Sequence, residues 1–328
     1  MKPAIIGLAG HVLTKDEARL LAQHRPLGVI LFARNIDVPA QVASLLAQVH
    51  AVLGRQSVAM VDQEGGRVAR LRPPYWRAHP PARDIGFLYA RDPTAGLRAA
   101  WLTGALIGAD CAAAGFTVVA APVLDVADPE GHDVIGDRAF ASDPQAVAAL
   151  GGEMANGLLA AGVQPVGKHA PGHGRARADS HLTLPVLDDV VDSDLLPFRA
   201  NAWLPWLMTA HIRYTARDMS APATQSAAII GGVIRATGFR GILITDDLAM
   251  QALHGSPGER AKTALAAGCD VALHCSGVLE ETRSVLDTIG DAPLGLGARL
   301  VYARALAAGA RRELDTAALA AERSALLA

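Results

Sequence analysis

The segment GILITD (residues 241–246) is an apolar, β-branched run that ends on two polar side chains. Seven further runs of this kind recur along the chain: AIIGLA (4–9), LGVILF (27–32), SVAMVD (57–62), TVVAAPV (117–123), VQPVGKH (163–169), WLMTAH (206–211) and DVALHC (270–275). Each run is almost continuously apolar rather than alternating, which is typical of strands that are covered on both faces. The sequence therefore predicts eight buried strands in a parallel sheet.

Helical patterns lie between these runs. Residues 14–17 form a capping box that opens a helix. Pro just inside a start and Gly just past an end mark other helices. The remaining predicted helices are a stripe over 42–53 closed by Gly54, and segments that open at Asp92, Asp143 and Ser256 and end near Gly115, Gly162 and Gly268.

Strands that alternate with helices indicate an α/β fold, and eight strands can close a barrel with a filled interior. We therefore expect a (β/α)8 TIM-type barrel that forms a single domain over residues 1–328. The alanine-rich segment 297–328 is expected to be a closing helix. A doubly wound open sheet is the alternative topology.

The composition narrows the classes of partner and location. Hydrophobic residues make up 51% of the chain, and 30 basic against 32 acidic residues give a formal net charge of −2. This balance gives no electrostatic reason to expect nucleic acid or an anionic membrane as partner. No signal peptide pattern opens the chain, and no segment approaches the ~20 apolar residues of a membrane helix. We expect a cytoplasmic monomer without a cofactor.

Three cysteines, Cys111, Cys269 and Cys275, are too few and too scattered for a disulfide framework. They are expected to be buried free thiols.

Polar side chains gather where the predicted strands end. In a (β/α)8 barrel these ends form the active-site face. Charged groups there cost free energy to desolvate unless they are paired or used, so the set predicts a polar pocket. The segments concerned are Asp62–Arg67, Gly136–Arg138, Lys168–His169, Thr209–His211 and Thr245–Asp247.

Several of these residues have a purely structural interpretation as well. The alternatives are that Asp62 caps a turn at Gly65-Gly66, Asp247 caps the next helix, His211 is a satisfied core histidine, and Arg138 forms a surface ion pair.

Four segments closely resemble glycoside hydrolase family 3: VDQEGGRVARL (61–71), GDRAF (136–140), GKHAPGHGRARADSHLTLP (167–185) and TDDLAM (245–250). Within the family they are similar to bacterial β-N-acetylhexosaminidases of peptidoglycan recycling, and the resemblance covers nearly the whole chain. Two positions depart from the family pattern, Ala170 for the usual Phe and Asp137 for a common Asn. Both lie beside functional positions, where they could alter the pocket lining.

The resemblance implies a role for each site residue. Asp246 would be the nucleophile, His181 the general acid/base, and Asp179 the group that orients and polarises His181. The residues implied to hold the sugar are Asp62, Arg70, Arg138, Lys168 and His169. The implied substrate is a small carbohydrate, N-acetylglucosamine linked to 1,6-anhydro-N-acetylmuramic acid in muropeptides.

The residues themselves fit retaining hydrolysis, which needs a nucleophile on one face of the sugar and a proton donor on the other. Histidine can give and take a proton near neutrality without burial. Pro171, Gly172 and Gly174 rule out a regular helix before His181, so this segment is predicted to be a mobile loop that carries His181 over the sugar.

Three alternatives remain at this point. The first is a metal site formed by His169, His173, His181 and Asp179, although Pro171 removes the helix that would align the histidines. The second is a sugar-binding barrel without activity. The third is a β-glucosidase or an N-acetylglucosaminide phosphorylase of the same family.

Overall fold

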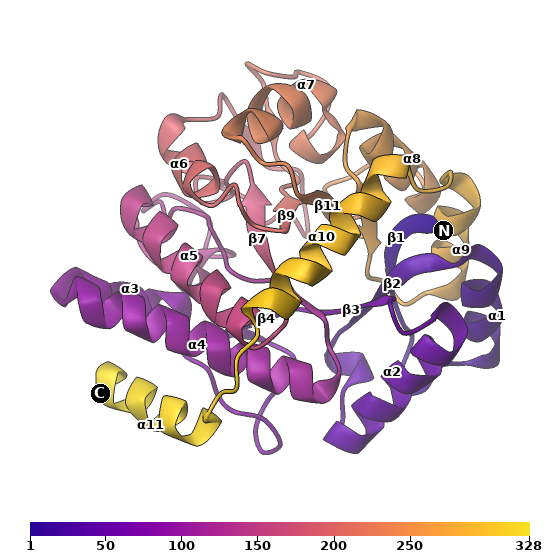
Figure 1. Cartoon of the computed structure of the whole chain (residues 1–328). Helices are drawn as coiled ribbons and strands as arrows, with labels where there is room; N and C mark the ends of the chain where they lie inside the picture. Colours follow the sequence, from indigo (N-terminus) through magenta and orange to yellow (C-terminus); the bar gives the residue numbers. More distant parts are fainter.

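The computed structural model describes residues 1–328 and contains a closed barrel of eight parallel strands surrounded by helices (Figure 1). The order around the barrel is β1-β12-β11-β9-β7-β6-β3-β2, with β1 paired to both β12 and β2. The barrel strands are β1 (Lys2–Gly7), β2 (Pro26–Leu31), β3 (Val58–Val61), β6 (Val118–Val119), β7 (Gln164–Ala170), β9 (Trp206–Thr209), β11 (Ile242–Asp247) and β12 (Val271–His274). The predicted (β/α)8 barrel is confirmed, and the open sheet is wrong.

Helices connect the strands and cover the outside of the barrel. Side chains of Thr14 and Ser256 complete capping boxes, and those of Asp92 and Asp143 cap their helices, as predicted. The helices are α1 (Lys15–His24), α2 (Pro39–Leu53), α3 (Ala82–Arg91), α4 (Pro93–Ala114), α5 (Pro144–Ala160), α6 (Asp192–Ala200), α7 (Ala227–Ile229), α8 (Pro257–Ala267), α9 (Leu279–Thr288), α10 (Leu294–Ala310) and α11 (Thr316–Leu327). None of them is long and apolar enough to cross a membrane.

Each strand buries side chains on both faces. In β11, Ile242 and Ile244 belong to a core cluster made of strand residues and α10, whereas Leu243 belongs to the cluster between barrel and outer helices. Because successive strand residues point to opposite faces, the first cluster is the barrel interior. Leu296 and Leu300 of α10 close the end of the barrel interior at which the strands begin, and Figure 1 shows α10 crossing the barrel there. Continuous apolar runs are therefore what this position in the fold requires.

Two segments differ from the sequence prediction. The run 117–123 forms only the two-residue strand β6, because Pro122 has no N–H to donate; the chain beyond it pairs with β7 through one isolated bridge, Val123 to Lys168. The tail is two helices rather than one. Arg311 is extended after α10, and Asp315 caps α11 with its side chain.

Short strand pairs decorate the barrel. β4 (Gln63–Gly65) and β5 (Val68–Ala69) form a hairpin directly after β3, and β8 (Val186–Leu187) pairs with β10 (Arg213–Tyr214). The three cysteines are buried free thiols, as predicted.

Candidate active site

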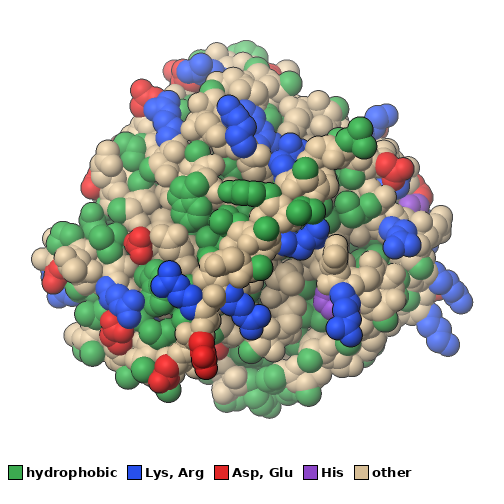
Figure 2. Space-filling view, viewed as in Figure 1, with side chains coloured by type: hydrophobic (Ala, Val, Ile, Leu, Met, Phe, Trp, Pro, Cys, Tyr) green, Lys and Arg blue, Asp and Glu red, His purple; other side chains and the backbone are tan.

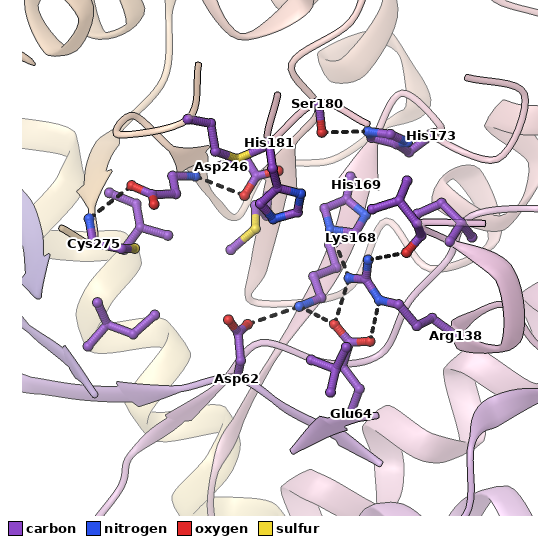
Figure 3. A pocket seen from close by; sticks show the side chains of 18 of the residues that line it. Asp62, Glu64, Arg138, Lys168, His169, His173, Ser180, His181, Asp246 and Cys275 are labelled. Carbon is purple, nitrogen blue, oxygen red and sulfur yellow. Dashed lines mark hydrogen bonds and ion pairs between the residues drawn. The ribbon is translucent and has the colours of Figure 1, made fainter. Parts of the chain in front are cut away.

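A cavity of about 340 Å³ opens at the carboxyl ends of the barrel strands. Seven of the eight residues assigned to the site line it: Asp62, Arg70, Arg138, Lys168, His169, His181 and Asp246 (Figure 3). The eighth, Asp179, does not line the cavity but contacts His181. The pocket predicted from the strand ends is therefore present. Neither Ala170 nor Asp137 lines it.

An ion-pair network lines the cavity. We call it the floor network and define it by Asp62, Glu64, Arg70, Arg138 and Lys168. Lys168 Nζ lies 3.0 Å from Asp62 Oδ1 and 2.5 Å from Glu64 Oε1. Arg138 makes two bonds to Glu64, both of 2.8 Å. Burial raises the pKa of the Glu64 carboxyl, but the charges of Arg138 and Lys168 outweigh it and hold that pKa well below its usual range. The surface-pair interpretation of Arg138 is wrong, since this pair is buried.

The β4–β5 hairpin places the acidic members of this network. Gly65 and Gly66 both have positive φ, of 104° and 54°, which the tight turn requires. The buried Gln63 side chain accepts hydrogen bonds from the backbone N–H groups of Arg70 and Leu71. Arg70 thereby comes within 3.3 Å of Asp62. Asp62 is thus an ion-pair partner of Lys168 and Arg70, and it makes no turn cap.

His169 is oriented by Asp125, a residue that the sequence analysis did not single out. Asp125 Oδ2 lies 2.6 Å from His169 Nδ1, and Oδ1 accepts from the backbone N–H groups of His169 and His173. The Asp125 side chain is completely buried. Burial raises the pKa of Asp125, but His169 and these N–H donors lower it overall. The ionised Asp125 therefore accepts from His169 Nδ1–H. The other ring nitrogen of His169, Nε2, then faces Arg138 Nη2 at 3.4 Å.

Asp246 stands at the end of β11 and faces the cavity (Figure 3). Its Oδ1 accepts from the N–H of Asp247 at 2.8 Å. Burial raises the pKa of the Asp246 carboxyl, but His169 and His211 and this hydrogen bond lower it to about 2. Asp246 is therefore a carboxylate throughout the neutral range.

Asp247 also contributes to the cavity wall. The register between β11 and β12 shifts between Ile244 and Asp247, and strict alternation ends there. Its Oδ1 accepts from the N–H groups of Ala249 and Cys275, both at 2.9 Å. It is not a helix cap, because α8 begins ten residues later with Ser256 as its cap.

His181 lies on the loop after β7, with 60% of its side chain exposed. Its Nδ1 is 2.7 Å from Asp179 Oδ1, and its backbone N–H donates to the same oxygen at 2.9 Å. Burial raises the pKa of Asp179, but the bonds from His181 lower it overall. The N–H of Gln251, beyond β11, donates to the His181 carbonyl at 3.3 Å. The predicted dyad is present, with Nε2 left free.

The base of this loop is firmly attached. Tyr214 Oη donates to the Gly172 carbonyl at 2.7 Å, and Arg175 pairs with Asp194 at 2.8 Å. His173 Nε2 contacts Ser180 Oγ at 2.9 Å, joining the base to the tip (Figure 3). Any motion of the loop would therefore be expected in the exposed tip around His181 rather than over the whole of 171–181.

His211 is a satisfied core histidine, the structural alternative weighed above. It is fully buried, with Nδ1 2.8 Å from Thr224 Oγ1 and Nε2 3.0 Å from the Asp247 carbonyl. Burial lowers its pKa. No three His, Cys, Asp or Glu side chains are grouped so that they could hold a metal ion.

A (β/α)8 barrel whose strand ends set a carboxylate and a loop histidine around a polar cavity supplies the two groups that a retaining glycoside hydrolase needs. The profile of the glycosyl hydrolase family 3 N-terminal domain matches residues 7–293. The chain belongs to this family.

Named relatives place it within the family. The beta-hexosaminidase of Nitrosomonas eutropha is 41% identical over 283 residues, which are 84% of this chain and 80% of that protein. The crystal structure of NagZ from Neisseria gonorrhoeae superposes with a TM-score of 0.88 at 30% identity and covers 100% of this chain and 98% of that one. That protein has also been crystallised with N-trifluoroacetyl-D-glucosamine. The chain is a beta-hexosaminidase of family 3.

Proposed function

We propose that this enzyme is a retaining β-N-acetylglucosaminidase that releases terminal N-acetylglucosamine by way of a covalent glycosyl-Asp246 intermediate. The observation that carries the proposal is that an ionised carboxylate and a dyad-held histidine line one cavity. A retaining mechanism needs these two groups on opposite faces of the sugar.

In the first step, an Asp246 oxygen attacks the anomeric carbon and the glycosidic bond breaks. His181 gives its Nε2 proton to the departing oxygen, so the aglycone leaves as an alcohol. In the second step, His181 takes a proton from water, whose oxygen attacks the same carbon and frees Asp246. Asp179 accepts from Nδ1–H and stabilises the imidazolium that forms when His181 takes up this proton, as the aspartate does in serine-protease triads.

The floor network would hold the sugar. Asp62 offers carboxylate oxygens and His169 its Nε2 as acceptors for hydroxyl groups, while Arg70, Arg138 and Lys168 offer donors. The charges of Glu64 and Asp62 fix Lys168 before substrate arrives, because its Nζ already touches both. Preorganised donors cost little rearrangement during the reaction.

The natural substrate that we propose is N-acetylglucosamine linked to 1,6-anhydro-N-acetylmuramic acid, with or without its peptide, processed in the cytoplasm by a one-domain monomer. Support comes from the relationship to NagZ and from the N-acetylglucosamine analogue bound to the Neisseria gonorrhoeae protein. A site that hydrogen-bonds an acetamido group rejects sugars lacking it, because its buried polar groups would be left unpaired. N-acetylglucosaminides should thus be cleaved far faster than glucosides.

The decisive experiment is trapping. The enzyme is incubated with a fluorinated N-acetylglucosaminide, its intact mass is measured, and the labelled peptide is mapped. The proposal requires one sugar attached to Asp246. Release of the 1-phosphate instead of free sugar in phosphate buffer would identify a phosphorylase, and equal kcat/KM for glucosides would identify a β-glucosidase.

A further inference from the structure

A second cavity, of about 360 Å³, lies at the opposite end of the barrel from the active site. It is bounded by the turn between α2 and β3, the first residues of β3 and β7, and α10. We call it the basal pocket and define it by Arg55, Ser57, Gly162, Gln164, Arg304 and Arg311. Figure 2 shows this end of the molecule, with several basic side chains near the diagonal helix α10.

The charge of the basal pocket is unbalanced. Arg55, Arg304 and Arg311 line it, and no Asp or Glu does. None of the three forms an ion pair, and only one of their side chains makes a hydrogen bond: Arg304 Nη1 donates to the Gln56 carbonyl at 3.4 Å. Arg235 and Arg299 behave differently, since both pair with Asp270, at 2.7 and 2.5 Å. Arg55 and Arg311 are exposed and Arg304 is half-buried, so the pocket presents three uncompensated positive charges to solvent, an arrangement that favours an anionic ligand.

The helix dipole explains the positions of only two of these three arginines. Arg55 follows the C-terminus of α2 and Arg311 that of α10, where a positive charge is favoured by the helix dipole. Arg304 lies inside α10, more than a turn from its end. The dipole also gives no reason for the three side chains to share one cavity.

The chain packs tightly around Arg311. Gly162 has a φ of 85°, and a Cβ built there would lie 3.0 Å from Arg311 Cδ. The N–H of Arg312 donates to the Ala160 carbonyl at 2.9 Å, which fixes the end of α10 against the turn before β7. The absence of a side chain at Gly162 thus lets the Arg311 stem lie on the backbone at the rim of the pocket.

Gln164 adds a buried polar group. It is 6% exposed, and its Oε1 accepts from Trp206 Nε1 at 2.8 Å. Because an indole N–H can only donate, this bond settles which end of the amide is oxygen. The Gln164 Nε2 hydrogen-bonds to no protein atom, so its two donors remain available to a molecule in the cavity.

We propose that the basal pocket binds a small phosphorylated anion. Guanidinium groups match phosphate oxygens in geometry as well as charge, and such bonds are among the stronger hydrogen bonds in proteins. The volume lies within the range of about 300–1,000 Å³ usual for small-molecule sites. The site is separate from the glycosidase cavity, and its existence does not depend on the function proposed above.

The test uses the full chain and inorganic pyrophosphate, with sodium chloride of matched ionic strength as the blank. Affinity is measured by calorimetry, and hydrogen exchange locates the site. We expect protection at residues 54–57 and 160–164. The variant R304Q/R311Q should bind at least tenfold more weakly, since each charged hydrogen bond is worth about a factor of ten or more. R91Q is the matched control, since Arg91 is exposed and unpaired in the last turn of α3, and it should stay within twofold.

Several results would overturn the proposal: no binding beyond the chloride blank, an equal loss in R91Q, tighter binding of malonate than of pyrophosphate, or protection at 168–181, which would put the anion in the active site. If R304Q/R311Q does not fold, R55Q serves in its place, because Arg55 is exposed on a turn. It should then weaken binding about tenfold, and unchanged affinity would overturn the proposal.

Discussion

Glu64 and Arg138 are joined by two hydrogen bonds, from Nε to Oε2 and from Nη2 to Oε1, each 2.8 Å long. The same carboxylate also contacts Lys168. Glu64 is therefore the carboxylate partner of Arg138 and shares Lys168 with Asp62. Removing one partner of a buried pair leaves the other charge buried without compensation.

Glu64→Gln should therefore lower the free energy of unfolding by about 3 kcal/mol, the lower part of the range for breaking a buried pair. Urea denaturation measures this change. Glu130→Gln is the control, because Glu130 pairs with Arg177 on the surface, where both side chains are more than 70% exposed. Its effect should stay below about 1 kcal/mol. Equal losses in the two variants would contradict the interpretation.

The network also predicts how stability depends on pH. The pKa values of Asp62, Glu64 and Asp125 are lower in the folded chain than their ordinary values, because ion pairs and hydrogen bonds outweigh burial. Such groups stabilise the fold fully above their unfolded pKa of about 4, and this contribution is lost as pH falls through the folded pKa. Burial lowers the pKa of His173 to about 4, so the folded chain holds this histidine neutral. The free energy of unfolding therefore begins to fall as pH drops below the ordinary histidine pKa of about 6.5.

The free energy of unfolding should thus decline from about pH 6.5 and fall more steeply below about pH 4. Urea denaturation at a series of pH values checks the two phases. Glu64→Gln should flatten the lower phase and leave the upper one unchanged. A variant curve parallel to that of the wild type would show that Glu64 does not cause the acid loss.

The strand ends were readable from sequence because a parallel barrel brings every carboxyl end to one face. Asp62, Lys168 and Asp246 follow long apolar runs and could be placed there without knowing any contact. Glu64 lies inside a recognised motif, but its partner Arg138 is 74 positions away. Spacing alone does not say which loops meet.

Asp125 was missed for another reason. Pro122 interrupts the fourth strand, so the polar residue that ends its path follows an irregular segment rather than a clear strand. The helix-cap alternative for Asp247 is wrong because β11 shifts its register after Ile244, and the Asp247 carboxylate accepts from the N–H groups of Ala249 and Cys275 instead. In each case the strand is locally irregular because of how it pairs with its neighbours, and a regular strand pattern in the sequence does not show such irregularity.

Asp246 and Asp247 offer a matched pair of variants. Asp246→Asn should lower kcat by a factor on the order of 10⁴–10⁶, as the loss of a nucleophile does elsewhere. Asp247→Asn should retain most activity, because an amide oxygen can still accept from the N–H groups of Ala249 and Cys275. Steady-state kinetics on a chromogenic N-acetylglucosaminide measures kcat for both variants. Full activity in Asp246→Asn, or a trapped sugar on Asp247, would overturn the assignment of the nucleophile.

The last prediction concerns the proton. His181→Ala should lower kcat/KM about 10²–10⁴-fold for substrates with poor leaving groups, the usual contribution of general acid catalysis. The loss should shrink for nitrophenyl leaving groups, which depart without a proton. His254→Ala is the control, because His254 is exposed and makes no hydrogen bond, and it should behave as wild type. Asp179→Asn should show the same dependence on leaving group to a smaller extent, since His181 keeps its proton but loses its charged partner at 2.7 Å. A loss of equal size for all leaving groups in His181→Ala would mean that His181 holds the sugar or the loop rather than donating the proton.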